Sequence, residues 1–239
     1  MKKLFLSLMA IVGMLSTVQM NAQPFFDTSD APQLFTFGGR IGFNTSNRTF
    51  PAGNYSNYMM TSWGTGFNIG AVANMNFKEY LSLQPGFFFE SRSGNLVNIV
   101  DYYTETYNPS TGQFETLEKT HYEVNHLRAY YFTIPIMGIA KFNLAENIKW
   151  MVEFGPYLQF CLKETGENNV EMLTTQGLNY MTYVAEHHGF DVGLKMGTSL
   201  KLYDHYYVGV HYLAGLTNAW KYPSGGKNKS WMFTVGYDF

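Results

Sequence analysis

Charge is scarce in this chain: 14% of its 239 residues are Asp, Glu, Lys or Arg, whereas a soluble domain carries about a quarter. A disordered chain is excluded, because disorder goes with few aromatic residues and 18% of this chain is aromatic. The formal net charge of −2 argues against a nucleic-acid-binding protein, which would show a basic stripe. No apolar run approaches the roughly 20 residues of a membrane helix, so a helical membrane protein is also excluded.

Cysteine is almost absent too. Cys161 is the single one, so no intramolecular disulfide can form. Without a supporting motif, we interpret it as a small apolar residue rather than a nucleophile. We expect no metal or cofactor either, because the acidic residues and histidines between positions 101 and 126 match no metal-loop spacing.

The pattern of the first residues indicates a secretory signal peptide over 1–22. Lys2 and Lys3 form a positive start, an apolar stretch follows to Val18, and Ala22 offers a cleavage site. A short buried helix is the alternative. We expect a polar leader over 23–33 and a single barrel domain over 34–239.

Strict alternation of apolar and polar residues dominates the chain after residue 33, which predicts strands with two different faces. Eight such segments occur: 35–44, 67–77, 81–92, 131–141, 148–162, 190–202, 206–216 and 231–239. Short links at 78–79, 143–147 and 203–205 alternate with long loops at 45–64, 93–127, 163–189 and 218–229. This pattern predicts an all-β, eight-stranded antiparallel up-and-down transmembrane barrel.

Alternation alone does not say which face lies inside, and a soluble ligand-binding barrel would bury its apolar face. Three features favour an apolar outside: glycines gather on the polar face, aromatic rings end the apolar face, and the polar face mixes charges that can pair in a narrow lumen. The predicted lumen network consists of Arg40, Glu90, Arg92, Lys149, Glu153, Asp191, Lys195 and Asp238. Side chains fill the lumen of an eight-stranded barrel, so we do not expect a diffusion pore.

The last strand ends on its apolar phase, with Tyr237 and Phe239. A terminal aromatic residue is the usual signal read by the barrel-assembly machinery. We therefore expect an outer-membrane location, with phospholipid and lipopolysaccharide as surroundings and no nucleic-acid partner.

Five segments then carry a family resemblance. They read GGRIGFNTSN at 38–47, LSLQPG at 81–86, YFTIPI at 131–136, FGPY at 154–157 and YLAGLTN at 212–218. In this order they resemble the strands of PorT-like outer-membrane β-barrel proteins. The resemblance implies an outer-membrane barrel of a Gram-negative cell, and its namesake is associated with protein secretion. Gly86 and Thr133 stand where that family usually has Glu, so no role of those two carboxylates carries over.

Three functional hypotheses remain. The expected loop at 93–127 is rich in rings that suit either surface recognition of a protein or glycan or a lipopolysaccharide-facing loop that simply extends the sheet: Tyr102, Tyr103, Tyr107, Phe114 and Tyr122. This favours a non-catalytic binding, adhesion or scaffold protein, with accessory work in secretion as the alternative. A lipid-modifying enzyme with His187 or His188 as base is less favoured, because no serine is placed beside either histidine.

Overall fold

The computed structural model describes residues 24–49, 59–166, 186–187, 189–222 and 226–239, and the predicted signal peptide lies outside this part of the chain. The strands are β1 (Phe35–Thr49), β2 (Met59–Lys78), β3 (Leu81–Asn108), β4 (Gln113–Ala145), β5 (Ile148–Gly166), β6 (Glu186–His187), β7 (Phe190–Leu202), β8 (Tyr206–Gly215), β9 (Trp220–Tyr222) and β10 (Lys227–Asp238). Among the described residues, no helix is long and apolar enough to cross a membrane.

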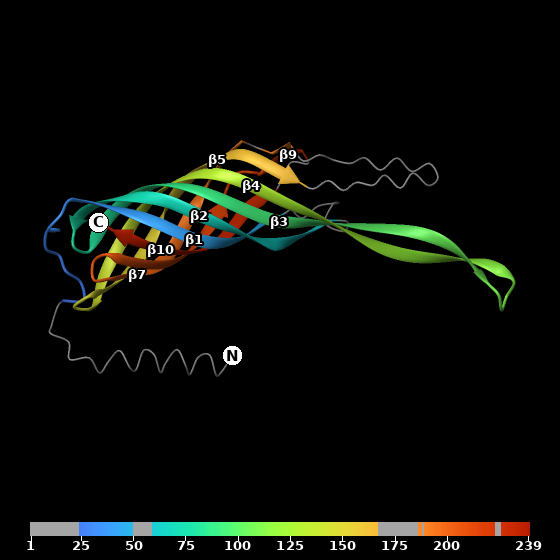
Figure 1. Ribbon diagram of the computed structural model, residues 1–239, viewed down its shortest axis with the longest axis horizontal. Helices are drawn as coiled ribbons and strands as arrows, with labels where there is room; N and C mark the ends of the chain where they lie inside the picture. Colours follow the sequence, from blue (N-terminus) through green and yellow to red (C-terminus); the bar gives the residue numbers. More distant parts are fainter. Residues whose placement is uncertain (1–23, 50–58, 167–185, 188, 223–225) are drawn as a thin grey trace.

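Eight of these strands close into an antiparallel barrel in the order β1-β10-β8-β7-β5-β4-β3-β2, which confirms the predicted fold class. The seam joins the first strand to the last over twelve residue pairs, from Gly38 opposite Asp238 to Thr49 opposite Lys227. Figure 1 shows the tilted strands wrapping one elongated barrel, with the short turns and the C-terminus at the same end. We assign this end to the periplasm, as in outer-membrane barrels.

The apolar face of each strand points outward, which contradicts a soluble barrel. Large apolar side chains are exposed around the whole wall, among them Phe37, Ile41, Phe154, Val208 and Val235. A water-soluble protein does not expose apolar surface on this scale. The outer wall therefore suits the hydrocarbon of a bilayer, where closure also leaves no backbone group without a partner.

The lumen is packed solid at several levels. Two clusters of buried side chains fill it: Met137, Ile139, Met151 and Tyr207 in one, and Tyr157, Leu213 and Met232 in the other. Glycine is required where an inward side chain would meet the neighbouring strand: a Cβ on Gly155 would lie 1.9 Å from the Ile136 carbonyl oxygen. These positions explain why glycines gather on the inward face.

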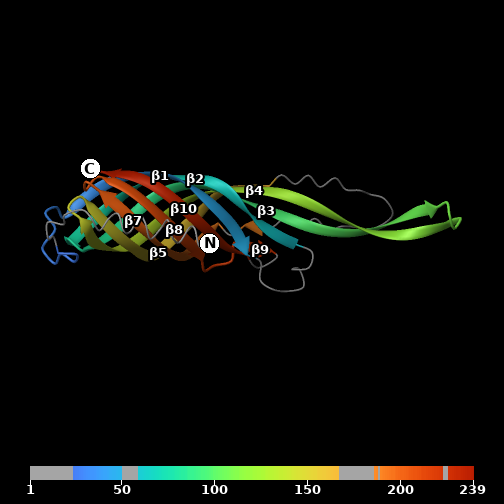
Figure 2. The same ribbon diagram turned by 90° about the horizontal axis from the view of Figure 1, so that it is seen from below.

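Most of the expected loop over 93–127 consists of paired strands, which agrees with the alternative that this segment extends the sheet. β3 and β4 continue through it as one hairpin, paired without a register shift from Leu81 opposite Ala140 to Asn108 opposite Gln113. Gly112, with a φ of 69°, closes the four-residue turn at the tip. Figures 1 and 2 show this hairpin reaching far beyond the barrel at the end opposite the C-terminus.

The other long connections are shorter than expected as well, because β1, β5 and β10 extend into them. The residues before β1 lie against the periplasmic turns. The ring of Phe26 packs 4.3 Å from that of Tyr80, centroid to centroid. The amide of Asn143 donates a hydrogen bond to the carbonyl of Phe25.

Candidate functional site

Seven of the eight predicted lumen residues are buried inside the barrel, and most of them lie in ion pairs or hydrogen bonds. The Arg92 guanidinium contacts the Glu90 carboxylate at 2.5 Å. Asp191 accepts a hydrogen bond from Asn228 at 2.9 Å. The Lys195 ammonium lies 5.0 Å from the centre of the Phe88 ring. Buried charges need such compensation, so these contacts permit the polar lumen.

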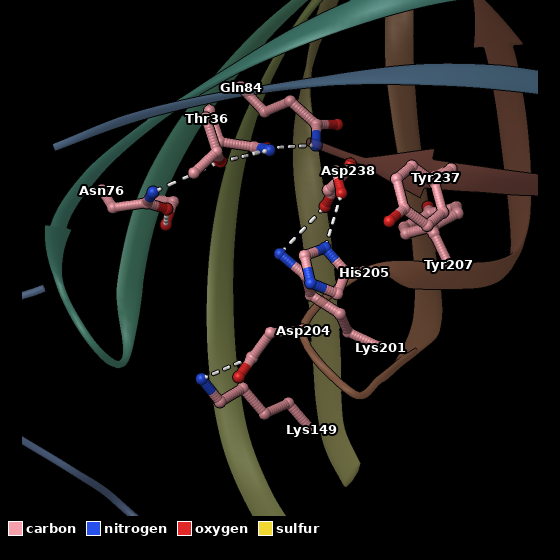
Figure 3. A network of polar contacts seen from close by, with 12 residues as sticks. Thr36, Asn76, Gln84, Lys149, Lys201, Asp204, His205, Tyr207, Tyr237 and Asp238 are labelled. Atoms are coloured by element: carbon pink, nitrogen blue, oxygen red, sulfur yellow. Dashed lines mark hydrogen bonds and ion pairs between the residues drawn. The ribbon is translucent and has the colours of Figure 1, made fainter. Parts of the chain in front are cut away.

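Arg40 and Asp238 meet at the periplasmic end of the seam. Their side chains form an ion pair at 2.6 Å, and the second oxygen of Asp238 contacts Lys201 at 2.9 Å. The Arg40 guanidinium also lies 4.1 Å above the Tyr207 ring. In Figure 3, Lys201 and His205 both point to Asp238, whose backbone carbonyl contacts the His205 ring at 2.8 Å.

Lys149 does not belong to the lumen network. It lies at the periplasmic rim, half-buried, between Glu79 at 3.1 Å and Asp204 at 2.9 Å. Asp204 sits in the tight turn between β7 and β8, where its backbone has a positive φ of 57°. Desolvation there raises the pKa of Asp204, but the hydrogen bond and charge of Lys149 outweigh it and the pKa falls below its usual value.

The centre of the lumen holds a cluster around Glu153, whose partners the predicted network did not include. Glu153 accepts a hydrogen bond from the Tyr207 hydroxyl at 2.8 Å and contacts the His211 ring at 2.9 Å. It also accepts a hydrogen bond from Ser199. The alternation placed Tyr207, His211 and Ser199 on the inward face, which was the available signal. All four side chains are buried, and none of them lines the pocket at the opposite end of the barrel from Lys149, so we interpret the cluster as structural.

That pocket opens at the extracellular mouth of the barrel. It has a volume of about 410 Å³, including space open to solvent. Most of the residues that line it are polar in type, among them Ser46, Arg48, Asn95 and Lys229, and they are joined by Leu127 and the ring of Tyr131. Arg48 donates a hydrogen bond to the Tyr131 hydroxyl at 2.8 Å and forms an ion pair with Glu164. Cys161, near the same end, is a half-buried free thiol.

The predicted recognition rings lie on the projecting hairpin rather than on a loop. Tyr103, Tyr107 and Phe114 are exposed. The rings of Tyr107 and Phe114 meet edge to face at 5.4 Å. Tyr102 and Tyr122 lie on β3 and β4 of the same hairpin, opposite Lys119 and Ile99.

The histidines proposed as a base do not form a described catalytic set. His187 pairs with Trp220 in the small β6–β9 sheet, and His188 lies outside the described residues. Asp191, their nearest acidic neighbour after residue 188, is buried and accepts hydrogen bonds from Thr217 and Asn228. Within the described residues, no group of three or more His, Cys, Asp or Glu side chains is arranged to hold a metal ion.

An apolar outer wall, a filled polar lumen and short turns at one rim define a small outer-membrane β-barrel. The sequence matches the outer membrane protein beta-barrel domain over residues 21–221, and the chain belongs to this family. The protein is thus located in the outer membrane.

Solved structures of two outer-membrane proteins are similar in fold. Ail, the attachment invasion locus protein of Yersinia pestis, shares 10% identity at a TM-score of 0.39, with 87% of this chain and 100% of that chain covered. OprG from Pseudomonas aeruginosa shares 11% identity at a TM-score of 0.43, with 91% and 99% covered. No curated protein matches the chain.

Proposed function

We propose that this barrel is a non-catalytic surface-binding protein whose β3–β4 hairpin contacts a protein or glycan outside the cell. One observation carries the proposal: the hairpin continues past the last residues that pair with the described parts of both neighbouring strands. β2 ends its pairing at Asn98 of β3, and β5 ends its pairing at Leu127 of β4. Ten further residues of β3 add about 34 Å at roughly 3.4 Å per residue.

The side chains on this hairpin support a binding role. Tyr103, Tyr107 and Phe114 share one face, because Tyr103 and Tyr107 are four residues apart and Phe114 lies opposite Tyr107. Exposed rings of this size give large contact areas at a low entropy cost. A hairpin that served only to close the barrel would need neither the length nor the rings.

Cells that display the barrel provide the test. The assay measures adherence to a panel of immobilised matrix proteins and glycans, with an empty-vector strain as background. We expect wild-type cells to bind at least one surface several-fold above background. The triple variant Tyr103→Ser, Tyr107→Ser, Phe114→Ser should return to background. Tyr203→Ser removes an equally exposed ring at the periplasmic turn and should leave adherence unchanged. Adherence at background for the wild type would refute the proposal.

The proposal also covers the lipids around the barrel and its assembly signal. The exposed apolar wall supports phospholipid and lipopolysaccharide as its neighbours in the membrane. Tyr237 and Phe239 remain the proposed signal for the barrel-assembly machinery, and Phe239 is among the most exposed rings of the described chain.

Accessory work in protein secretion is the second candidate, supported by the five PorT-like segments. Gly86 and Thr133 lack the carboxylates usual in that family, and Thr133 instead accepts a hydrogen bond from Gln159. Co-purification from solubilised membranes distinguishes the two roles. A stable complex with secretion components would favour the accessory role, and a barrel recovered alone would favour surface binding.

A further inference from the structure

Within the described part of the chain, the projecting hairpin leaves one edge of β3 without a paired strand. The pairing of β2 with β3 begins at Met59 opposite Asn98. From Ile99 to Asn108, β3 pairs with β4 on one side, and no strand of the described residues pairs with it on the other. An open edge of this length is a ready template for another strand.

The register identifies which residues face this open edge. The amide of Lys141 donates to the carbonyl of Tyr80 at 2.8 Å, and β3 and β4 continue from there without a shift. Hydrogen-bonded pairs alternate along an antiparallel ladder, so even-numbered residues of β3 bond to β4. The odd-numbered residues therefore present their N–H and C=O groups to the open edge: Ile99, Asp101, Tyr103, Glu105 and Tyr107. None of them is proline.

The charge of the hairpin restricts what can occupy the edge. Residues 99–126 contain five carboxylates (Asp101, Glu105, Glu115, Glu118 and Glu123) and one lysine, Lys119, which gives a formal charge of −4. A second copy of the chain would bring the same charge to the edge, and like charges across a strand pair are destabilising. Phosphate-bearing partners are repelled for the same reason.

We propose that the open β3 edge from Ile99 to Tyr107 binds an extended, lysine- or arginine-rich segment of a partner protein by strand addition. The proposal rests on the surface-binding role and names its partner class. Backbone hydrogen bonds hold the added strand, and the carboxylates of the hairpin attract its cations. Tyr103 and Tyr107 offer ring faces to the same cations.

The test uses the full-length barrel in a lipid nanodisc and fluorescent peptides of nine residues. The probe alternates Lys and Val. One control alternates Glu and Val, and another repeats the Lys–Val sequence with two adjacent central amides N-methylated, which blocks both of its edges at unchanged charge. We expect the probe to bind at least tenfold more tightly than either control, and more weakly when salt rises from about 50 to 500 mM.

Variants of the barrel test the same edge. Tyr103→Pro removes an outward N–H and should reduce probe affinity at least tenfold. Tyr103→Val keeps the N–H and should cost less. Glu105→Gln together with Glu115→Gln should weaken binding and flatten its salt dependence. Hydrogen exchange at even-numbered β3 amides checks that the hairpin still forms in Tyr103→Pro.

Three results would overturn the inference. Equal binding of the probe and its N-methylated control would mean attraction by charge alone. Self-association of the barrel through the hairpin would mean that the occupant is a second copy. No binding of the probe, together with ring-dependent adherence of cells, would reject strand addition and leave the surface-binding role standing.

Discussion

The Asp238 carboxylate lies 2.6 Å from the Arg40 guanidinium and so joins the last strand of the barrel to the first. The other oxygen of Asp238 contacts Lys201 on β7, so one carboxylate faces two cations. The side chains of Arg40 and Lys201 are 2% and 12% exposed, and neither can recover its hydration in the folded barrel. Removing the carboxylate therefore leaves two buried charges without their partner.

Asp238→Asn should lower the free energy of unfolding by about 3–5 kcal/mol, the usual cost of breaking a buried ion pair from one side. The measurement is the urea midpoint of the heat-modifiable band after refolding in vitro, which avoids effects on assembly in the cell. The triple variant Arg40→Met, Lys201→Met, Asp238→Leu removes the charges together and should regain part of the loss. An unchanged midpoint in Asp238→Asn would show that this carboxylate does not hold the seam.

Glu153 is the hub of the central lumen, with contacts to Tyr207, His211 and Ser199. Glu153→Ala should cost about 3–5 kcal/mol, because it leaves buried polar groups without partners. Glu153→Gln keeps the shape and one acceptor oxygen, and should cost less. The exposed turn residue Glu146 provides the control, since Glu146→Gln should shift the urea midpoint little. Equal midpoints for the Glu153 variants and this control would contradict the role of the hub.

The strands, and which of their side chains point to the lipid or to the lumen, could be predicted because burial differs between the two sides of a barrel wall. Phe37 and Phe154 meet lipid while Arg40 and Glu153 meet the lumen, so the period of two is visible in the sequence. For the hairpin beyond Asn98, the sequence left open whether the segment is a loop or an extension of the sheet, because water lies on both of its faces. Glu105, Thr106 and Tyr107 are all exposed there, so no apolar alternation marks the strand.

The position of each lumen residue along the barrel axis, and the residues that it contacts, could not be predicted for a different reason. The phase of a strand tells which face a side chain lies on, but not how far along the barrel axis. Lys149 has the phase of a lumen residue and yet lies at the rim beside Asp204. Glu153 and His211 are 58 residues apart in sequence, and only the closing order of the strands brings them together.

The residues around Asp30, before β1, should be held less firmly against the rim at acidic pH. Asp30 contacts Lys78 at 2.6 Å, and this hydrogen bond and charge hold the pKa of Asp30 below its ordinary value of 3.8. A lowered pKa in the folded state means that the stabilisation is present above about 3.8 and is lost as pH falls through the folded value. Both groups are largely exposed, so the effect is small and local.

Hydrogen exchange at the Glu79 amide, which donates to the Ser29 carbonyl at 3.1 Å, reports this docking. After correction for the intrinsic rate, its protection should fall between pH 6 and pH 3 in the wild type. Lys78→Gln should show the lower protection at both pH values. Protection that is unchanged by pH in the wild type would rule out the Asp30 contact as the cause of docking.

The ring pair at the hairpin tip should stabilise the hairpin and leave the barrel unaffected. Tyr107 and Phe114 lie directly opposite each other, and their rings meet edge to face at 5.4 Å. A cross-strand aromatic pair contributes about 0.5–1.5 kcal/mol, which matters in a two-stranded ribbon that is marginal on its own. Phe114→Ala should therefore raise amide exchange between Ile99 and Asn108 several-fold. The heat-modifiable migration should stay the same, because the barrel closes without this pair. Loss of the folded band in Phe114→Ala would mean that hairpin and barrel fold as one unit, whereas unchanged exchange would mean that β3–β4 backbone pairing alone holds the hairpin.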